Sequence, residues 1–234
     1  MNGYYKEHAR HYVGIDCVIF GLCNGKLNIL LIKRRMMPGK DNWSLMGGFV
    51  EEDESADDAA KRVLYQLTGL EDVYMEQVGT FGDPGRDPGA RVISIAYCAL
   101  INFDEHDRRR VSDNNALWVP LDEMPPLAFD HPMIVNKALD WLREKVHRHP
   151  LVFQFLPKMF TLRQLQSVYE AILGEELDKR NFRKRTAETG MLENTGLIDK
   201  SHSRRGATLY KLKNTTWDSE KRPKDSSNID NRNA

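Results

Sequence analysis

Three observations predict an α+β fold in two parts for this chain of 234 residues. First, apolar and β-branched runs bounded by turn residues recur between residues 13 and 120, as in the strands of a sheet. Second, two amphipathic helices are expected, over 55–68 and 133–146. Third, the order after residue 150 is helix, turn, basic helix and hairpin, which is typical of a winged helix-turn-helix. We therefore expect a sandwich of mixed sheet and helices over 1–150, a winged helix-turn-helix over 151–216 and a disordered polar tail over 217–234.

Residue type and turn signals predict the strands of the first part. Runs over 13–20 and 27–32 flank Asn24-Gly25, a strong β-hairpin signal. A loop over 82–89, rich in glycine, aspartate and proline, is expected to join two further strands. The β-branched and aromatic runs that complete the predicted sheet cover 74–81, 92–100 and 117–120.

Capping residues indicate where the helices begin and end. Ser55 caps the first helix of the sandwich, and Gly69 ends it. Pro132 opens the second, which stops before residues 149–150. In the second part we expect a helix over 161–173 between Thr161 and Gly174, a basic helix over 179–189 capped by Asp178, and strands at 197–198 and 208–212.

Composition excludes a membrane protein and a disulfide framework. No apolar run approaches the ~20 residues of a membrane span, and the start lacks the order of a secretion signal. The three cysteines form no Cys-x-x-Cys pair, which argues against structural zinc. We therefore expect a cytoplasmic protein without a bound metal or cofactor.

The charge is distributed unevenly, although the whole chain is neutral. Residues 1–150 hold 18 basic and 23 acidic side chains, whereas 151–216 hold 12 basic and 7 acidic ones. Such asymmetry indicates an acidic part joined to one that meets polyanions, and chance variation of a solvated surface is the alternative.

The basic helix over 179–189 is the predicted DNA-binding element. It follows a capped helix and a short turn, where a recognition helix belongs, and we expect Phe182 to pack inward. Arginine and asparagine can pair with guanine and adenine edges, while lysine contacts phosphates. A solvated basic helix and a protein-binding adaptor are the alternatives. The candidate DNA-binding residues are Lys179, Arg180, Asn181, Arg183, Lys184 and Arg185 in the helix and His202, Arg204 and Arg205 in the predicted wing.

The segment from Gly48 to Leu70 resembles the Nudix box. Glu54 follows Gly48 after five residues, Arg62 follows after seven more, and Gly69-Leu70 closes the motif. The resemblance implies a Nudix-type α/β/α sandwich, in which the box forms a loop, a helix and a loop. It also implies that Glu54 and Arg62 pair to brace this segment, so we assign both a structural role.

The glutamates that hold Mg²⁺ in active Nudix enzymes are missing from the box. Their positions carry Val63, Gln66 and Leu67. Mg²⁺ takes hard oxygen ligands and is usually held by carboxylates, so we expect no catalytic residues and no hydrolase activity. The alternative is an active hydrolase whose metal has moved to the acidic residues at 51–54, although acidic residues at a helix entry also complement the helix dipole.

Segments outside the box resemble the Nudix-related transcriptional regulators, over about residues 8–213. The resemblance implies a homodimer that binds a palindromic DNA operator and senses a small metabolite with its Nudix half. Met46 and the lost glutamates resemble most the L-arabinose-responsive, AraR-like branch, which regulates sugar catabolism; regulation of NAD metabolism by ADP-ribose is the alternative. The segments that carry the resemblance are 33–35, 43–50, 81–88, 91–97, 127–131, 160–173 and 181–185.

The candidate effector site lies on loops and strand ends that flank the box. Sugar pockets combine an aromatic face with charged and amide groups for the hydroxyls. We expect a pentose to bind here and to release DNA, and a Nudix half kept only as a dimerisation platform is the alternative. The candidate effector-binding residues are Lys33, Arg34, Arg35, Asp41, Trp43, Asp83 and Arg86.

Overall fold

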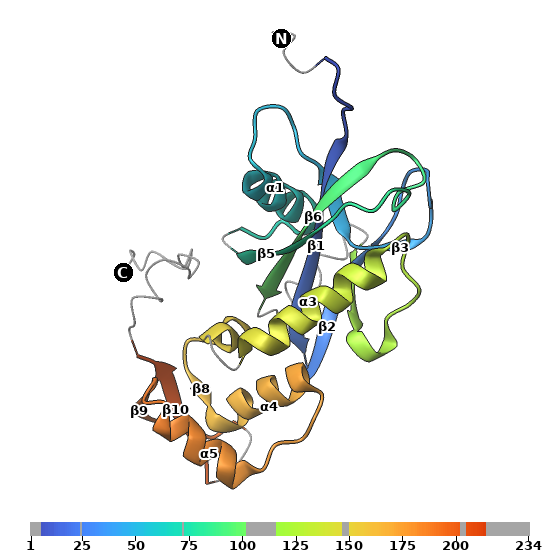
Figure 1. The fold of residues 1–234 in the computed structure, drawn as a ribbon. Coiled ribbons are helices and arrows are strands. Elements are labelled where there is room, and N and C mark those ends of the chain that lie inside the picture. Colours follow the sequence, from blue (N-terminus) through green and yellow to red (C-terminus); the bar gives the residue numbers. More distant parts are fainter. Residues whose placement is uncertain are drawn as a thin grey trace, which may run out of the picture.

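A computed structural model describes residues 6–23, 25–71, 73–101, 116–146, 150–201 and 205–213. Its described part contains a seven-stranded mixed sheet in the order β3-β2-β1-β6-β5, with β4 paired to β1 and β7 paired to β2 (Figure 1). The strands are β1 (Tyr12–Cys23), β2 (Lys26–Lys33), β3 (Trp43–Ser44), β4 (Met46–Phe49), β5 (Tyr74–Phe81), β6 (Val92–Ile101) and β7 (Ala116–Pro120).

Two apolar layers cover the faces of this sheet. The central strands β1 and β6 run parallel and are buried along most of their length, as expected for strands covered on both faces. Alternation along β1 sends Ile15, Cys17 and Ile19 toward α1 (Ala56–Thr68), whereas Val18 and Phe20 join the cluster under α3 (His131–Val146). The predicted sandwich of helix, sheet and helix is therefore confirmed.

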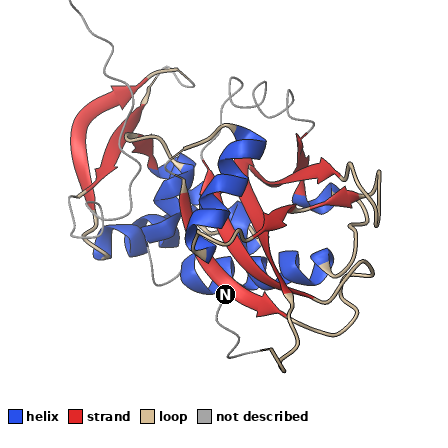
Figure 2. Cartoon of the chain, turned by 90° about the horizontal axis from the view of Figure 1, so that it is seen from above, coloured by secondary structure: helices blue, strands red, loops and turns tan. Residues whose placement is uncertain are grey.

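The second part is a winged helix. Its helices are α4 (Leu162–Leu173) and α5 (Lys179–Glu188), and its small sheet has the order β8-β10-β9. Figure 2 shows this small sheet at one side of the molecule, apart from the large sheet. Its strands are β8 (Phe160–Thr161), β9 (Leu192–Asp199) and β10 (Ala207–Leu212).

Side-chain caps hold the helix ends where the sequence predicts them. Ser55 accepts a hydrogen bond from the Asp58 backbone N–H at the start of α1. Thr161 and Gln164 form a reciprocal capping box at the start of α4, which satisfies two otherwise unpaired backbone donors. Gly69 and Gly174 end these two helices with positive φ angles of 68° and 75°, which glycine adopts without strain.

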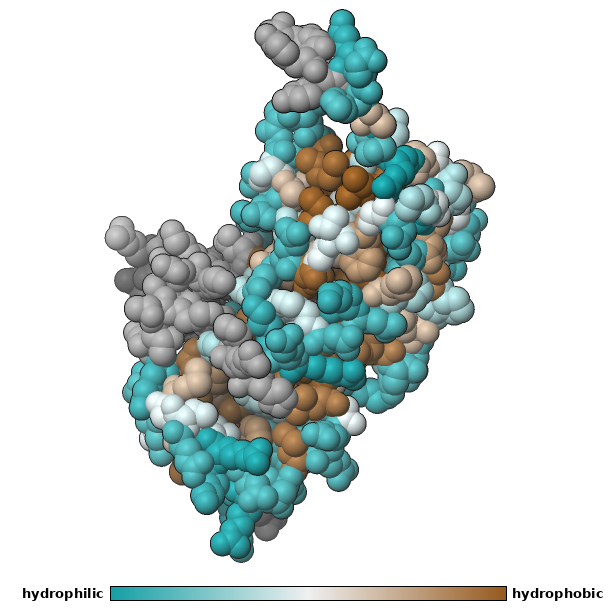
Figure 3. All heavy atoms as spheres, in the orientation of Figure 1, coloured by the Kyte–Doolittle hydropathy of each residue, from teal (hydrophilic) through white to brown (hydrophobic). Residues whose placement is uncertain are grey.

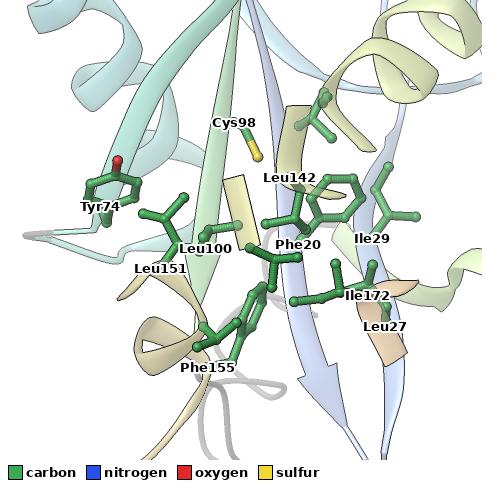
Figure 4. Close-up of a cluster of buried hydrophobic side chains, with 14 of the residues drawn as sticks. Phe20, Leu27, Ile29, Tyr74, Cys98, Leu100, Leu142, Leu151, Phe155 and Ile172 are labelled. Atoms are coloured by element: carbon green, nitrogen blue, oxygen red, sulfur yellow. The ribbon is translucent and has the colours of Figure 1, made fainter. Parts of the chain in front are cut away.

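One apolar cluster runs from the large sheet into the winged helix. Phe20 and Leu27 from the β1–β2 hairpin lie near Ile172 of α4 and near Phe155 of the 3₁₀ helix Pro150–Phe155 (Figure 4). Leu212 of β10 belongs to the same cluster. The winged helix therefore packs directly on the sandwich.

Several elements differ from the prediction. Strands β3, β4 and β8 were not predicted, because strands of two to four residues show no measurable alternation. Helix α3 begins at His131 instead of residue 133, and β9 begins at Leu192 instead of residue 197. The early part of β9 is polar and mostly exposed, so its apolar content does not mark it as a strand. The tail over 217–234 lies outside the described residues. Among the helices that the structure describes, none combines the length and apolar character that crossing a membrane requires.

Candidate functional site

A cavity of about 390 Å³ opens at one end of the large sheet. Gly47 and Gly48 of β4 line it, and a Cβ on Gly47 would lie 2.8 Å from the Ile15 carbonyl oxygen, so β4 approaches β1 too closely for a larger residue at this position. The polar and aromatic residues that line the cavity include Asp16, Lys33, Arg34, Arg35, Ser44, Gln66, Arg86, Asp87, Ser94, Phe129 and His131.

A buried charged network forms one wall. Arg86 donates two hydrogen bonds of 2.8 Å to the carboxylate of Asp130 and one of 3.2 Å to Asp16. Ser94 donates to the same Asp16 oxygen at 2.5 Å. The side chains of Arg86, Asp16 and Asp130 are only 5%, 10% and 16% exposed. Burial lowers the pKa of Arg86, but the paired carboxylates outweigh it and raise that pKa above its ordinary value.

His131 adds a neutral imidazole to this wall. The Leu45 backbone N–H donates to His131 Nδ1 at 3.1 Å, so the proton of the neutral ring is assigned to Nε2. This nitrogen faces Asp16 Oδ1 at 3.6 Å, which is too long for a hydrogen bond. Burial lowers the pKa of His131 below its ordinary value although two carboxylates raise it, so the ring is uncharged at neutral pH.

Three consecutive basic residues, Lys33, Arg34 and Arg35, form a basic wall of the cavity. The Lys33 ammonium lies 5.2 Å from the centroid of the Trp43 ring. The Arg34 guanidinium lies 4.6 Å from the Phe129 ring centroid, and its Nε donates to the Pro38 carbonyl at 2.9 Å. Phe129 has a φ of +54°, which a bulky residue rarely adopts and which turns up mainly at functional sites. Among the described residues, no carboxylate pairs with Lys33, Arg34 or Arg35.

The structure brings most of the candidate effector residues together. Lys33, Arg34, Arg35 and Arg86 line the cavity, while Asp41 and Trp43 line a more open hollow of about 450 Å³ beside the same three basic residues. Asp83 lines neither; it is exposed, and its carbonyl accepts the Arg86 backbone N–H at 3.2 Å. It therefore serves the turn of the 82–89 loop.

Sequence reasoning missed four members of the buried network: Asp16, Ser94, Asp130 and His131. Asp16 and Ser94 are polar residues inside otherwise apolar strands. A buried polar group needs a partner, so this interruption of an apolar run was a signal that could have found them.

The Nudix-box segment has the brace but lacks the metal ligands. Arg62 donates to both carboxylate oxygens of Glu54, at 2.9 and 2.5 Å, and to the Phe49 carbonyl at 2.9 Å. These bonds, and the Glu51 backbone N–H, lower the pKa of Glu54 to about 2. Val63 is buried against Gly48, and Gln66 contributes a neutral amide to the cavity. Among the described residues, no group of three or more His, Cys, Asp or Glu side chains is arranged so that it could hold a metal ion. The residues present do not fit the divalent cation of an active Nudix box.

Helix α5 carries the candidate DNA-binding residues on an exposed surface. Phe182 packs against Tyr169 of α4 with ring centroids 5.4 Å apart, which confirms its inward orientation. Asp178 caps the helix by accepting the Asn181 backbone N–H at 2.8 Å. The lower tip of the molecule, where α5 lies, is hydrophilic in Figure 3. Lys179, Arg180, Asn181, Arg183, Lys184 and Arg185 are all exposed, as is Arg205, whereas His202 and Arg204 lie outside the described residues.

Comparison with known protein families finds a match for each of the two parts of the fold. The NUDIX domain model matches residues 14–142, and the model of the NrtR DNA-binding winged helix domain matches residues 152–212. The chain is 38% identical to the ADPR responsive transcriptional repressor NtrR of Acinetobacter baylyi, over 85% of this chain and 80% of that protein. The chain belongs to the NrtR family of Nudix-domain regulators. The predicted Nudix fold and winged helix are confirmed.

Solved structures of the NrtR family share this architecture. Shewanella oneidensis NrtR complexed with a 27mer DNA is 31% identical, with a TM-score of 0.77, over 86% of this chain and 93% of that one. The NUDIX domain of the same Shewanella protein, complexed with ADP ribose, is 29% identical with a TM-score of 0.52, over 61% of this chain and 99% of that one.

The predicted assignment to an arabinose-responsive branch is wrong. The Acinetobacter relative, which matches both parts of this chain, is described as ADPR responsive, so a pentose effector and a role in sugar catabolism are not supported. The two features on which that prediction rested, Met46 and the missing glutamates, do not report on the effector. Met46 is fully buried beside α1, where it fills the core, and the lost glutamates would bind a metal rather than a nucleoside or a sugar.

Proposed function

We propose that this protein is a transcriptional repressor of NAD-metabolism genes and that ADP-ribose, bound by its Nudix domain, releases it from DNA. The observation that carries the proposal is the basic cavity of about 390 Å³ in a chain that also bears an exposed basic helix. Such a cavity is large enough for a nucleotide-sized ligand. The repressor activity of the Acinetobacter relative and the ADP ribose complex of the Shewanella NUDIX domain support the same effector.

DNA-binding measurements with and without effector test this proposal. Short duplexes selected by the full chain from a randomised pool serve as probes in fluorescence anisotropy. Saturating ADP-ribose is expected to lower DNA affinity at least about tenfold, which corresponds to ~1.4 kcal/mol of coupling between the sites. L-arabinose serves as the negative control. An anisotropy curve that ADP-ribose leaves unchanged would refute the effector, because a ligand that binds both states equally shifts nothing.

The residues at the box support a second part of the proposal, that the protein does not hydrolyse its ligand. Val63 and Gln66 supply no carboxylate, and Glu54 is engaged by Arg62. Without a metal, the charge of the phosphate is not neutralised and the attacking water is not activated. Incubation of the full chain with ADP-ribose and Mg²⁺ or Mn²⁺ is expected to yield no AMP. Turnover at ordinary enzyme rates of ~1–10³ s⁻¹ would contradict this.

The proposed regulator acts as a homodimer in the cytoplasm. Residues 1–150 form the sensing and dimerisation domain and 151–216 form the DNA-binding domain. A single winged helix contacts few base pairs, so two copies on a palindromic operator supply the specificity. Light scattering after size exclusion is expected to give the mass of a dimer at concentrations that saturate DNA; a monomer bound to full-length operator would count against this arrangement.

A further inference from the structure

We propose that the cavity binds the diphosphate of its ligand without a divalent cation, and that Lys33, Arg34 and Arg35 supply the balancing charge. This inference rests on the proposed function of the same cavity. It assigns to a basic strand end the task that Mg²⁺ performs at an active Nudix box.

In the described part of the chain, Asp16 and Asp87 are the carboxylates that line the cavity, and both accept hydrogen bonds from protein donors, as does Glu54 of the neighbouring box. Arg62 occupies both oxygens of Glu54, and Gly89 donates its backbone N–H to Asp87 Oδ1 at 2.7 Å. One oxygen of Asp16 accepts from Arg86 and Ser94, and the other faces His131. A magnesium ion needs several free oxygen ligands in near-octahedral geometry, which these side chains do not offer.

The helix that would carry metal ligands presents apolar and amide groups instead. A Cβ on Gly48 would lie 2.9 Å from Val63 Cγ2, so the valine methyl fills the space between α1 and β4. Gln66 faces the cavity with an amide whose oxygen accepts from Arg62 at 3.4 Å. Among the described residues of α1, only Gln66 lines the cavity, so this helix offers a diphosphate there no carboxylate that a cation could bridge to.

The basic wall, in contrast, has donors to spare. Arg34 uses only its Nε for the Pro38 carbonyl, and among the described residues its two terminal NH₂ groups have no hydrogen-bond partner. Stacking on the Phe129 ring orients the guanidinium without using these in-plane donors. A fork of two parallel N–H groups matches two phosphate oxygens. Lys33 and the exposed Arg35 add two further charges with no carboxylate partner in the described part of the chain.

Calorimetric titration of the full chain with ADP-ribose tests the inference directly. The dissociation constant is expected to agree within about twofold between a buffer with EDTA and one with Mg²⁺. The Arg34→Gln variant is expected to bind ADP-ribose about tenfold or more weakly in both buffers, because it loses a charge-assisted bond. For adenosine, which lacks phosphate, the same substitution should matter less than about threefold.

Two further variants keep this test decisive. Arg35→Gln removes an exposed cation of the same wall and should also weaken ADP-ribose binding. It replaces Arg34→Gln as the test if that variant fails to fold. Lys61→Gln removes an exposed cation of α1 outside the cavity and should leave affinity unchanged.

Each contrary outcome identifies a different failure. Binding that disappears in EDTA and returns with Mg²⁺ overturns the inference but leaves ADP-ribose as the effector. Equal losses for adenosine and ADP-ribose in Arg34→Gln overturn the phosphate role of this wall. The absence of ADP-ribose binding in both buffers removes the proposed function itself.

Discussion

Replacement of Arg86 by methionine is expected to destabilise the fold by about 3 kcal/mol. The substitution keeps a long side chain but removes the cation between Asp16 and Asp130, which are 10% and 16% exposed. Breaking a buried ion pair costs about 3–5 kcal/mol because a desolvated charge is left without a partner. Asp16 lines a cavity that water can enter, so the lower end of that range applies.

Thermal and urea unfolding of the two proteins measure this effect. For a chain of this length ~3 kcal/mol corresponds to a fall of roughly 6–12 °C in the melting temperature. Arg91→Met is the matched control, because Arg91 follows the same loop and pairs with no carboxylate in the described residues. In a double-mutant cycle with Asp130→Asn, the two changes should be less than additive by about 1.5–3 kcal/mol. A loss below about 1 kcal/mol for Arg86→Met, or full additivity, would refute the structural role of the network.

Three further predictions concern the box, the recognition helix and a helix cap. Arg62 holds the pKa of Glu54 at about 2, below its ordinary 4.5. The stability that the wild type gains over Glu54→Gln should therefore be full above ~pH 5 and should vanish as the pH falls toward 2. A stability difference that stays constant in melts at several pH values would contradict the pairing. In DNA-binding anisotropy at several salt concentrations, Arg183→Ala should relax the sequence preference. Lys184→Ala should instead weaken binding to all sequences alike and reduce the slope of log affinity against log salt by about 1, and Lys61→Ala should change neither property. Identical behaviour of the two α5 variants would argue against their assigned contacts. Thr161→Ala should cost about 1 kcal/mol in urea unfolding, and no change would mean that the capping box adds nothing.

Local chemistry explains which elements were predictable. Ser55, Thr161 and Asp178 cap helices because their side chains reach the backbone donor three residues ahead, which depends on local sequence. The long strands β1 and β6 could also be predicted from the sequence, since their residue types indicate burial on both faces. The short strands β3, β4 and β8 were not, because pairing with β2, β1 and β10, respectively, creates them.

The cavity wall was harder to predict, because its members come from distant segments. Arg86 meets Asp16 across 70 residues and Asp130 across 44. Nothing in the spacing of the sequence indicates such an encounter. The basic residues at 33–35 were found because three adjacent cations are visible in the sequence, but the aromatic partner Phe129 of Arg34 was not. The identity of the effector depends on the shape and charge of the assembled cavity, and the missing box glutamates carry no information about it.

The apolar cluster that joins the large sheet to the winged helix limits the spacing of the half-sites that the proposed dimer can bind. Ile172 and Leu212 are buried together with Phe20 and Leu27, so the recognition helix cannot swivel without opening this core. In the DNA-bound state of the proposed dimer, the distance between the two recognition helices is therefore set by packing and not by a flexible tether. Half-sites that are moved apart by about five base pairs, half a helical turn, would face opposite sides of the duplex and could not both be occupied.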